Sequence, residues 1–543
     1  MARHPRRDVV AGLTVGVVAL PLALAFGISS GRGAEAGIAT AIVAGILAAL
    51  FGGSNLQVSG PTGAMTVVLV PIVAQFGVEA ILVVGLLAGL FLVGLAYAGA
   101  GRTMRYIPVP VVEGFTIGIA VIIALQQVPN ALGLAGDAGH ATVLVATLEA
   151  AATWAVAPTW TALAITGGVA GLMLLATRLR PGVPVSLVAV AIATVAATVG
   201  NLDVAMIGAI PAGLPLPRIP DVASLDVGRL VVPAVAVAAL AALESLLSAT
   251  VADGMRVGER HDSDRELFGQ GVANLVVPLF GGVPATAAIA RTAVNVRSGA
   301  RSRLAAITQS IALLAVVLVA APWVAMIPLA ALAGVLVATA IQMIEVSSLT
   351  AILRSTRGDA VVLVLTAIAT IALDLVTAVI LGLVVAGAFA LQQVASSARM
   401  DEIPLDAGDH DDEESALLDE HIVAYRLDGP LFFGAAHTFL LELSEISDVR
   451  VVVLRLSRLA TIDATGASVL ADTIQRLEHR HVSVLLSGIR EEHRAILTRL
   501  GVFHQLADER HVFDSTPDAI EHARVHASRF VHGTGTEAGA SER

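Results

Sequence analysis

Cysteine and lysine are both absent from this chain of 543 residues. Without cysteine, the protein can form no disulfide, no thiolate metal site and no cysteine nucleophile. Charged residues make up only 14% of the sequence and hydrophobic residues make up 56%, whereas a soluble protein carries about 25% charged residues. The scarcity of charge therefore indicates a membrane protein, and the lipid bilayer is its first expected partner.

Basic clusters and enzyme motifs are also missing. The net charge of −11 comes with no basic patch, so nucleic acid is not an expected partner. No HExxH or Walker pattern occurs. We therefore expect neither an enzyme nor a bound cofactor. No metal site is expected either, because His479, His481 and His493 do not form a convincing ligand set.

About fourteen apolar segments fill the first 398 residues, and several are shorter than the ~20 residues of a full span. The first resembles a signal peptide, but Pro21 interrupts it and further segments follow, so we interpret it as a retained span. The segments predict a transmembrane domain over 1–398, with repeats at about 9–200 and 228–398. They lie near 9–28, 36–52, 62–76, 79–100, 109–128, 158–177 and 184–199, and near 229–251, 268–281, 286–297, 303–320, 323–342, 359–373 and 376–397.

The sequence after Ala398 has a different character. Residues 399–417 are acidic and predict a solvated linker. From 418 to 530, strand-like runs such as "VRVVVLRLS" alternate with helical periodicity such as "GASVLADTIQRLEHR", which is typical of a small α/β domain. The tail at 531–543 is predicted to be disordered.

The distribution of arginine predicts an orientation in the membrane. Cytoplasmic loops are enriched in basic residues. If the N-terminus lies in the cytoplasm, the outer loops hold only Arg32, Arg218 and Arg229, and the other loop arginines fall inside. Both termini and the α/β domain are therefore expected in the cytoplasm. If the chain starts in the cytoplasm and crosses the membrane seven times, the first repeat ends on the outer side. The second seven segments would therefore run with inverted topology.

The third segment of each repeat is short and follows a Gly/Pro break. The two stretches are "SGPTGAMTVVLVPIVAQF" and "GGVPATAAIARTAV". Paired interruptions of this kind point to a transporter's binding site. If the two helix starts meet, each contributes free N–H groups and about half a positive charge. With Arg291, they would form an anion trap. The alternative for Arg291 is an anchor that reaches the membrane surface.

Several long motifs, in order along nearly the whole chain, resemble the SulP anion transporters, the sulfate permease family. They are "VVALPLALAFGISSG" (17–31), "FGGSNLQVSGPTGAMT" (51–66), "ESLLSATVADG" (244–254) and "ELFGQGVANLVVPLFGGVPATAAIARTAVNVRSGARSRLA" (266–305). The C-terminal part resembles that family's STAS domain around "LRLSRLATIDATGASVLADTI" (454–474).

The resemblance implies an α-helical polytopic fold of 14 segments in a 7+7 inverted repeat, with core and gate domains and a cytoplasmic α/β STAS domain. It also implies a homodimer, elevator-like movement of the core, and the cytoplasmic membrane of a bacterium as the location. The implied anion-binding residues are Leu22, Phe26, Thr62, Gly63, Ala64, Ala288, Ile289, Ala290 and Arg291.

The coupling ion and the substrate stay open. Glu244 lies within an apolar segment, where a carboxylate is a functional hypothesis by default, and Ser248 shares its face. A purely structural pair of Glu244 with Arg291 is the alternative. The first motifs resemble sodium–bicarbonate transporters, which imply a hydroxyl where this chain has Ile289 and a glycine where it has Arg291. We therefore favour a proton over sodium as coupling ion, with bicarbonate or sulfate as the anion.

Three further interpretations complete the prediction. In proteins related to the STAS domain, the residue corresponding to Thr465 is phosphorylated, but "DATG" also fits a helix cap, which we favour. An uncoupled anion channel or exchanger would use the same pocket. A membrane-anchored sensor would place the function in the STAS domain and would carry no anion.

Overall fold

Helices dominate the first two thirds of the chain, and a β-sheet organises the last third. The protein is seen in a computed structural model. It divides into two units, Met1–Ala386 and Gly387–Arg543, which we describe separately. The structure describes residues 5–102, 107–134, 143–179, 185–211, 213–220, 225–256, 260–373, 375–396, 399–402, 421–432, 449–508 and 510–533.

Apolar helices follow the first predicted repeat closely. The third, fourth and fifth predicted segments appear as α3, α4 and α5, because a backbone in lipid must pair its N–H and C=O groups internally, as a helix does. The helices are α1 (Pro5–Ser29), α2 (Ala34–Phe51), α3 (Gly63–Phe76), α4 (Ala80–Tyr97), α5 (Val109–Gln126), α6 (Val128–Ala131), α7 (Val143–Val156), α8 (Trp160–Leu179) and α9 (Val185–Val199).

The second repeat, like the first, consists of long helices and one short helix that follows a break in the chain. Among the described residues of both repeats, nine helices are long and apolar enough to cross a membrane. The second set comprises α10 (Val227–Gly254), α11 (Ser263–Val276), the 3₁₀ turn η2 (Val277–Phe280), α12 (Ile289–Arg297), α13 (Leu304–Ala325), α14 (Leu329–Met343), α15 (Val346–Ser355), α16 (Arg357–Ala372) and α17 (Leu375–Ser396).

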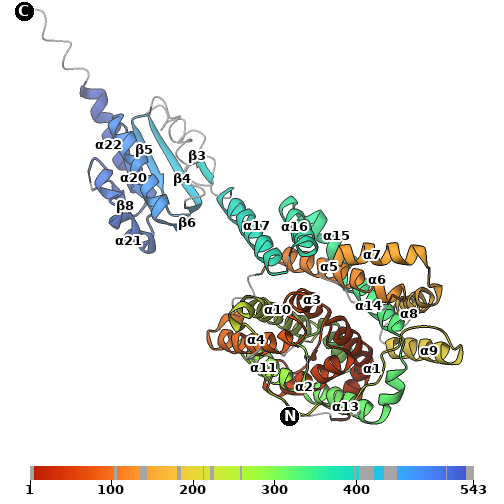
Figure 1. Ribbon diagram of the computed structural model, residues 1–543. Coiled ribbons are helices and arrows are strands. Elements are labelled where there is room, and N and C mark those ends of the chain that lie inside the picture. Colours follow the sequence, from red (N-terminus) through yellow and green to blue (C-terminus); the bar gives the residue numbers. More distant parts are fainter. Residues whose placement is uncertain are drawn as a thin grey trace, which may run out of the picture. The chain divides into compact units, whose positions relative to one another are not determined.

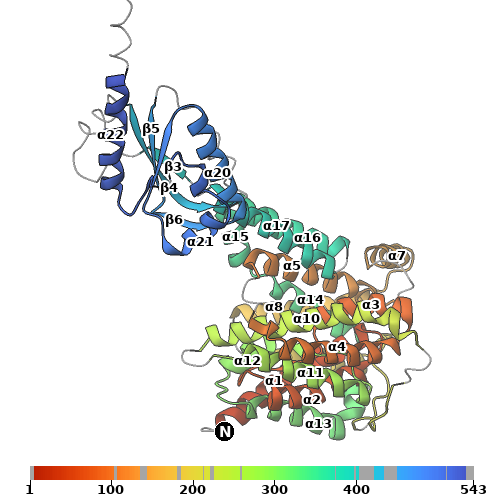
Figure 2. The same ribbon diagram turned by 90° about the vertical axis from the view of Figure 1, so that its left-hand side faces the viewer.

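Within the first unit the helices form two packed groups (Figures 1 and 2). In one group, α1 packs against α2 and α13, and α4 packs against α10 and α11. In the other, α5 packs against α16 and α14, and α14 packs against α8. The groups meet where α1 contacts α9 and α14 and where α3 contacts α5. This division matches the core and gate that the family resemblance implied.

Small residues let helices of the first group approach closely. A side chain at Gly37 would place its Cβ 1.9 Å from the carbonyl oxygen of Ala23, and one at Gly27 would lie 2.6 Å from the backbone nitrogen of Gly37. Glycine at both positions therefore allows α1 and α2 to pack backbone to backbone, as is common where membrane helices associate.

The second unit is a mostly parallel sheet with helices. Its strands are β3 (Arg399–Glu402), β4 (Ile422–Leu431), β5 (Val451–Arg455), β6 (Leu459–Ile462), β7 (Ser483–Ser487) and β8 (Val512–Phe513). They are ordered β3-β4-β5-β7-β8, with β6 paired to β4 and only β3 antiparallel. The helical elements are α20 (Ala464–His479), α21 (Glu491–Arg499), the turn η3 (Phe503–Gln505) and α22 (Thr516–Gly533).

Some predicted boundaries are wrong. Arg399–Glu402 belongs to the sheet as β3, because these residues pair with Asp428 to Tyr425 of β4, whereas the sequence predicted a linker over 399–417. The rest of that linker, 403–417, lies outside the described residues. The predicted disordered tail began at 531, but α22 continues to Gly533, and residues 534–543 also lie outside the described part.

Candidate functional site

Two short strands bring the interrupted segments of the two repeats together. β1 (Ser59–Gly60) pairs antiparallel with β2 (Thr286–Ala287). Each strand leads directly into a short helix, β1 into α3 and β2 into α12. The pairing therefore places two helix N-termini beside each other, each with about half a positive charge. This is the arrangement that the two Gly/Pro breaks predicted.

Buried side chains satisfy the irregular backbone that precedes α12. The hydroxyl of Thr40 accepts the N–H of Val283 at 2.8 Å, and the side-chain carbonyl of Asn274 accepts the N–H of Ala285 at 2.8 Å. The hydroxyl of Ser245 accepts the N–H of Ala287 at 3.2 Å. Non-helical backbone is tolerated at membrane depth only with such partners, so these contacts keep the break stable.

Ser248 lies one helical turn after Glu244 on α10, fully buried. Its hydroxyl donates to the hydroxyl oxygen of Thr292 at 3.0 Å, and that oxygen also accepts the N–H of Val58 at 3.1 Å. The structure thus gives Ser248 a contact that fixes α10 against α12 and the residues before β1.

Arg291, in the first turn of α12, is only 1% exposed. One terminal nitrogen, Nη2, donates to the carbonyl oxygen of Pro61 at 2.6 Å. The other, Nη1, has no hydrogen-bond partner among the described residues. The side chain passes close to Gly60, where an added Cβ would lie 2.6 Å from Nη1. A buried guanidinium with an unused donor is a group that an anion can satisfy.

Glu244 is half-buried on α10 and reaches the start of α3. Its Oε2 accepts a hydrogen bond from the hydroxyl of Thr62 at 2.9 Å. The same hydroxyl oxygen caps α3 by accepting the N–H of Met65 at 3.3 Å. Glu244 and Arg291 interact electrostatically, yet these two described side chains form no direct ion pair. Thr62 therefore links the carboxylate to the helix start.

The remaining candidate residues surround the two helix starts. Phe26 and Leu22 are buried on α1, in the same hydrophobic cluster as Ala64. The ring of Phe26 lies against Gly63, where an added Cβ would be 3.2 Å from Cε1. On the α12 side, Ala288 and Ile289 are half-buried and Ala290 is exposed. The structure thus brings residues of α1, α3 and α12 together, as the sequence predicted.

Polar residues of α11 form a network that the sequence analysis missed. Glu266 accepts the N–H groups of Gly53 and Ser54 at 2.9 and 3.0 Å, and Gln270 donates to the hydroxyl of Ser59 at 2.7 Å. With Asn274, these side chains recur every four residues, so they share one helix face. Three buried polar residues at that spacing in an apolar segment were a readable signal.

Thr465 is exposed as the second residue of α20, far along the chain from the helix starts. Asp463 caps this helix by accepting the N–H of Gly466 at 2.7 Å. The helix cap that we favoured for "DATG" is therefore present.

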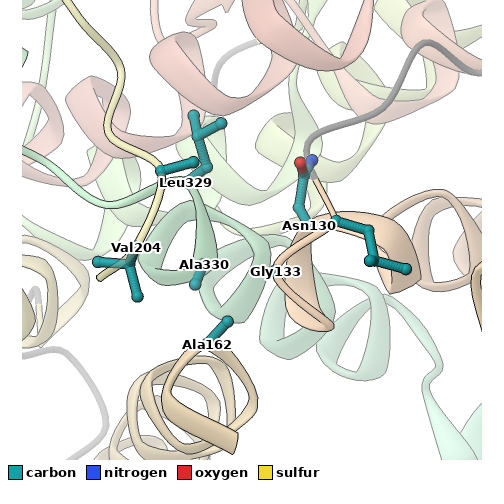
Figure 3. A pocket seen from close by; sticks show the side chains of 8 residues that line it. Asn130, Gly133, Ala162, Val204, Leu329 and Ala330 are labelled. Atoms are coloured by element: carbon teal, nitrogen blue, oxygen red, sulfur yellow. The ribbon is translucent and has the colours of Figure 1, made fainter. Parts of the chain in front are cut away.

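A separate pocket lies among α6, α8 and the start of α14 (Figure 3). No charged side chain lines it, so it offers an anion no electrostatic attraction. Its lining residues are Asn130, Gly133, Leu134, Ala162, Val204, Ala205, Leu329 and Ala330. In the described part of the first unit, no three His, Asp or Glu side chains approach closely enough to share a metal ion.

Comparison with known proteins identifies the family. The sequence pattern of the sulfate permease family matches residues 6–366, and that of the STAS domain matches residues 416–519. The chain is 36% identical over 524 residues to the putative sulfate transporter YvdB of Bacillus subtilis, covering 94% of this chain and 96% of the relative. It is 31% identical over 545 residues to the bicarbonate transporter BicA of Picosynechococcus, covering 96% and 95%.

The fold also matches a solved structure. The murine Slc26a9 anion transporter in its inward-facing state superimposes with a TM-score of 0.82 at 17% identity, covering 97% of this chain and 92% of that one. This likeness confirms the predicted polytopic helical fold with its C-terminal α/β domain. The relatives are transporters, in agreement with the prediction that the chain is not an enzyme.

Proposed function

The chain belongs to the sulfate permease family, and from that premise we propose that it is a secondary active transporter of a small inorganic anion. Sulfate and bicarbonate are the leading substrates, since relatives that match nearly its whole length are named for them. Such a multi-pass protein fits the cytoplasmic membrane of a bacterium, with both termini and the STAS domain inside, as the arginine distribution predicts.

The burial of Arg291 is the main observation that supports anion transport. Its side chain is 1% exposed and leaves Nη1 without a partner among the described residues. A charge at this depth is expensive and marks a substrate pathway by default. A bound anion would accept from Nη1 and from N–H groups at the starts of α3 and α12. Arg291 and the two helix N-termini are three positive features, which favour an anion over a cation or a neutral solute.

Glu244 is the proposed coupling group. An anion that arrives beside Arg291 adds negative charge close to this carboxylate and so favours its protonation. By linkage, protonation of Glu244 favours anion binding by the same factor. The side chain of Ile289 offers no oxygen to a sodium ion, at the position where the resemblance to sodium–bicarbonate transporters implies a hydroxyl. Symport with a proton is therefore the mechanism we propose, in preference to sodium-dependent symport.

Elevator-type alternating access is the proposed movement, within a homodimer. The helices that hold the candidate site, α1, α3, α10 and α12, pack mainly with one another and with α2, α4, α11 and α13. Such a group can move as one body, because its internal contacts need not change. The helices α5, α14 and α16 would then form the stationary part.

Transport by the full chain in proteoliposomes tests the function. Labelled sulfate and bicarbonate are offered under a proton gradient, under a sodium gradient at symmetric pH, and under neither. We expect accumulation that follows the proton gradient and is independent of sodium. The Glu244→Gln variant should keep anion binding but lose pH-driven accumulation, whereas Glu35→Gln, at an exposed carboxylate on α2, should behave as the parent chain.

Other results would select a different mechanism. Robust sodium-driven uptake would overturn the proton proposal in favour of a sodium symporter. Flux that only equalises the anion concentration on both sides would indicate an uncoupled channel. No flux of any tested anion, with the protein correctly reconstituted, would contradict transport itself and favour a sensor.

A further inference from the structure

Three histidines from two segments meet in the second unit. His511 directly precedes β8, and His522 and His526 lie on α22. Their ring centroids are separated by 5.5 Å (His511 and His522), 5.0 Å (His511 and His526) and 4.9 Å (His522 and His526). One ring nitrogen from each lies within 4.8 Å of the other two. We propose that these three side chains bind one Zn²⁺ ion, or another divalent transition metal that prefers imidazole.

The spacing suits a first-row transition metal. His522 and His526 are four residues apart on one helix, which places both rings on the same face, as in the i, i+4 histidine pairs of zinc sites. Zinc binds imidazole nitrogen at about 2.0–2.1 Å, so nitrogens around a tetrahedral ion lie about 3.3 Å apart. The three side chains would have to move closer together to bind zinc, and α22 and β8 are already neighbours.

The burial of His511 suits a metal ligand. This side chain is 3% exposed, and its Nδ1 has no hydrogen-bond partner among the described residues. A buried nitrogen without a partner is costly, and coordination would satisfy it.

Asp508 lies near the three histidines but outside the group of close ligand atoms. Its carboxylate interacts electrostatically with His511 and His522 and accepts the N–H of Arg510 at 2.9 Å. A water molecule would occupy the fourth position of a tetrahedral ion. Imidazole nitrogens with one oxygen ligand suit Zn²⁺, Co²⁺, Ni²⁺ and Cu²⁺ and do not suit Mg²⁺ or Ca²⁺.

The site would fasten α22 to the edge of the sheet. Ala519, Ile520 and Ala523 of α22 already pack in one cluster with Val451 of β5 and Leu485 of β7. A metal held by β8 and α22 together would add a second, polar attachment to this apolar contact. Metal binding would therefore be expected to raise the thermal stability of the second unit, because it favours the folded form alone.

Metal titration of the full-length chain tests this inference. The protein carries a streptavidin-binding tag in place of a histidine tag, is stripped with chelator, and is titrated in detergent with Co²⁺ and then Zn²⁺. We expect a strong visible absorption typical of tetrahedral Co²⁺ that saturates at one equivalent per chain and is abolished by one equivalent of Zn²⁺. The thermal midpoint of the second unit should rise with Zn²⁺.

Two double variants separate this site from the other histidines. His522→Gln with His526→Gln should abolish the absorption and the thermal shift, whereas His479→Gln with His481→Asn removes as many histidines elsewhere in the unit and should change neither. X-ray absorption of the zinc-loaded parent chain should show three imidazole ligands. Absence of binding, equal binding by both variants, or fewer than two imidazoles at the zinc would overturn the proposal.

Discussion

The two helix starts at the centre of the membrane unit look alike in sequence and differ in chemistry. Both follow a two-residue strand, but α3 begins after Thr62, whose hydroxyl caps it, whereas α12 begins after Ala288, with no side-chain cap. In addition, α12 carries Arg291 in its first turn, and α3 has no charged residue there. The protein thus provides a side-chain acceptor for an N–H group at the start of α3 and none at the start of α12.

This difference suggests that the two helix starts have different roles in anion binding and proton coupling. The open start of α12, with the guanidinium beside it, would supply most of the attraction for an anion. The capped start of α3 shares its hydroxyl with Glu244, so it would connect the anion to the proton-carrying group. Substitutions at the two starts should therefore have unlike effects.

Replacing Arg291 with alanine should have the largest effect. Loss of charge-assisted hydrogen bonds worth about 1.5–3 kcal/mol would weaken anion binding about 10- to 150-fold, and transport would fall at least as far. Arg297→Ala, at an exposed position near the other end of the same helix, is the matched control. Anion binding by calorimetry on monodisperse protein measures the effect, and parental affinity in Arg291→Ala would refute this role.

Gly60→Ala should have an intermediate effect, because the new side chain displaces the guanidinium without removing it and also strains a backbone whose φ is +159°. The new Cβ would lie 2.6 Å from Nη1 of Arg291 and 3.3 Å from the Cα of Ala41. The arginine side chain must shift, and a misplacement of about 1 Å can cost about 100-fold in rate. Uptake should fall while expression and monodispersity persist. Gly94→Ala, which meets no atom within 4 Å, should leave uptake unchanged; equal uptake in both variants would argue against precise placement of Arg291.

Thr62→Val should have the smallest effect on affinity and a specific effect on pH dependence. The change removes the cap of α3, worth about 1 kcal/mol of stability, and the hydrogen bond to Glu244. We expect near-parental anion binding but a shifted pH profile of uptake. Thr66→Val, one turn later, removes a hydroxyl that donates only to the carbonyl of Thr62 and should leave the profile in place. Identical pH profiles of uptake in the two variants would contradict the proposed link between the start of α3 and Glu244.

The sequence alone determined the positions of most membrane helices. The prediction of a segment at 109–128 corresponds to Val109–Gln126, and that at 62–76 corresponds to Gly63–Phe76. Apolar runs are readable because a span needs about 20 consecutive, predominantly apolar residues. Short helices such as Val143–Val156 and Val346–Ser355 were not predicted, because neither apolar run is long enough to indicate a membrane span.

For the site, the sequence determined which residues are unusual, and only the tertiary structure decided what they contact. An arginine and a glutamate in apolar segments stand out because burying charge is expensive. Their partners depend on residues far apart in the chain: Arg291 and Pro61 are separated by 230 positions, and Glu244 and Thr62 by 182. The same holds for β3, whose partner strand follows some twenty residues later, and for His511 with α22. The sequence shows that a charged side chain in an apolar segment is costly to bury. Only the tertiary structure shows which partner compensates that cost.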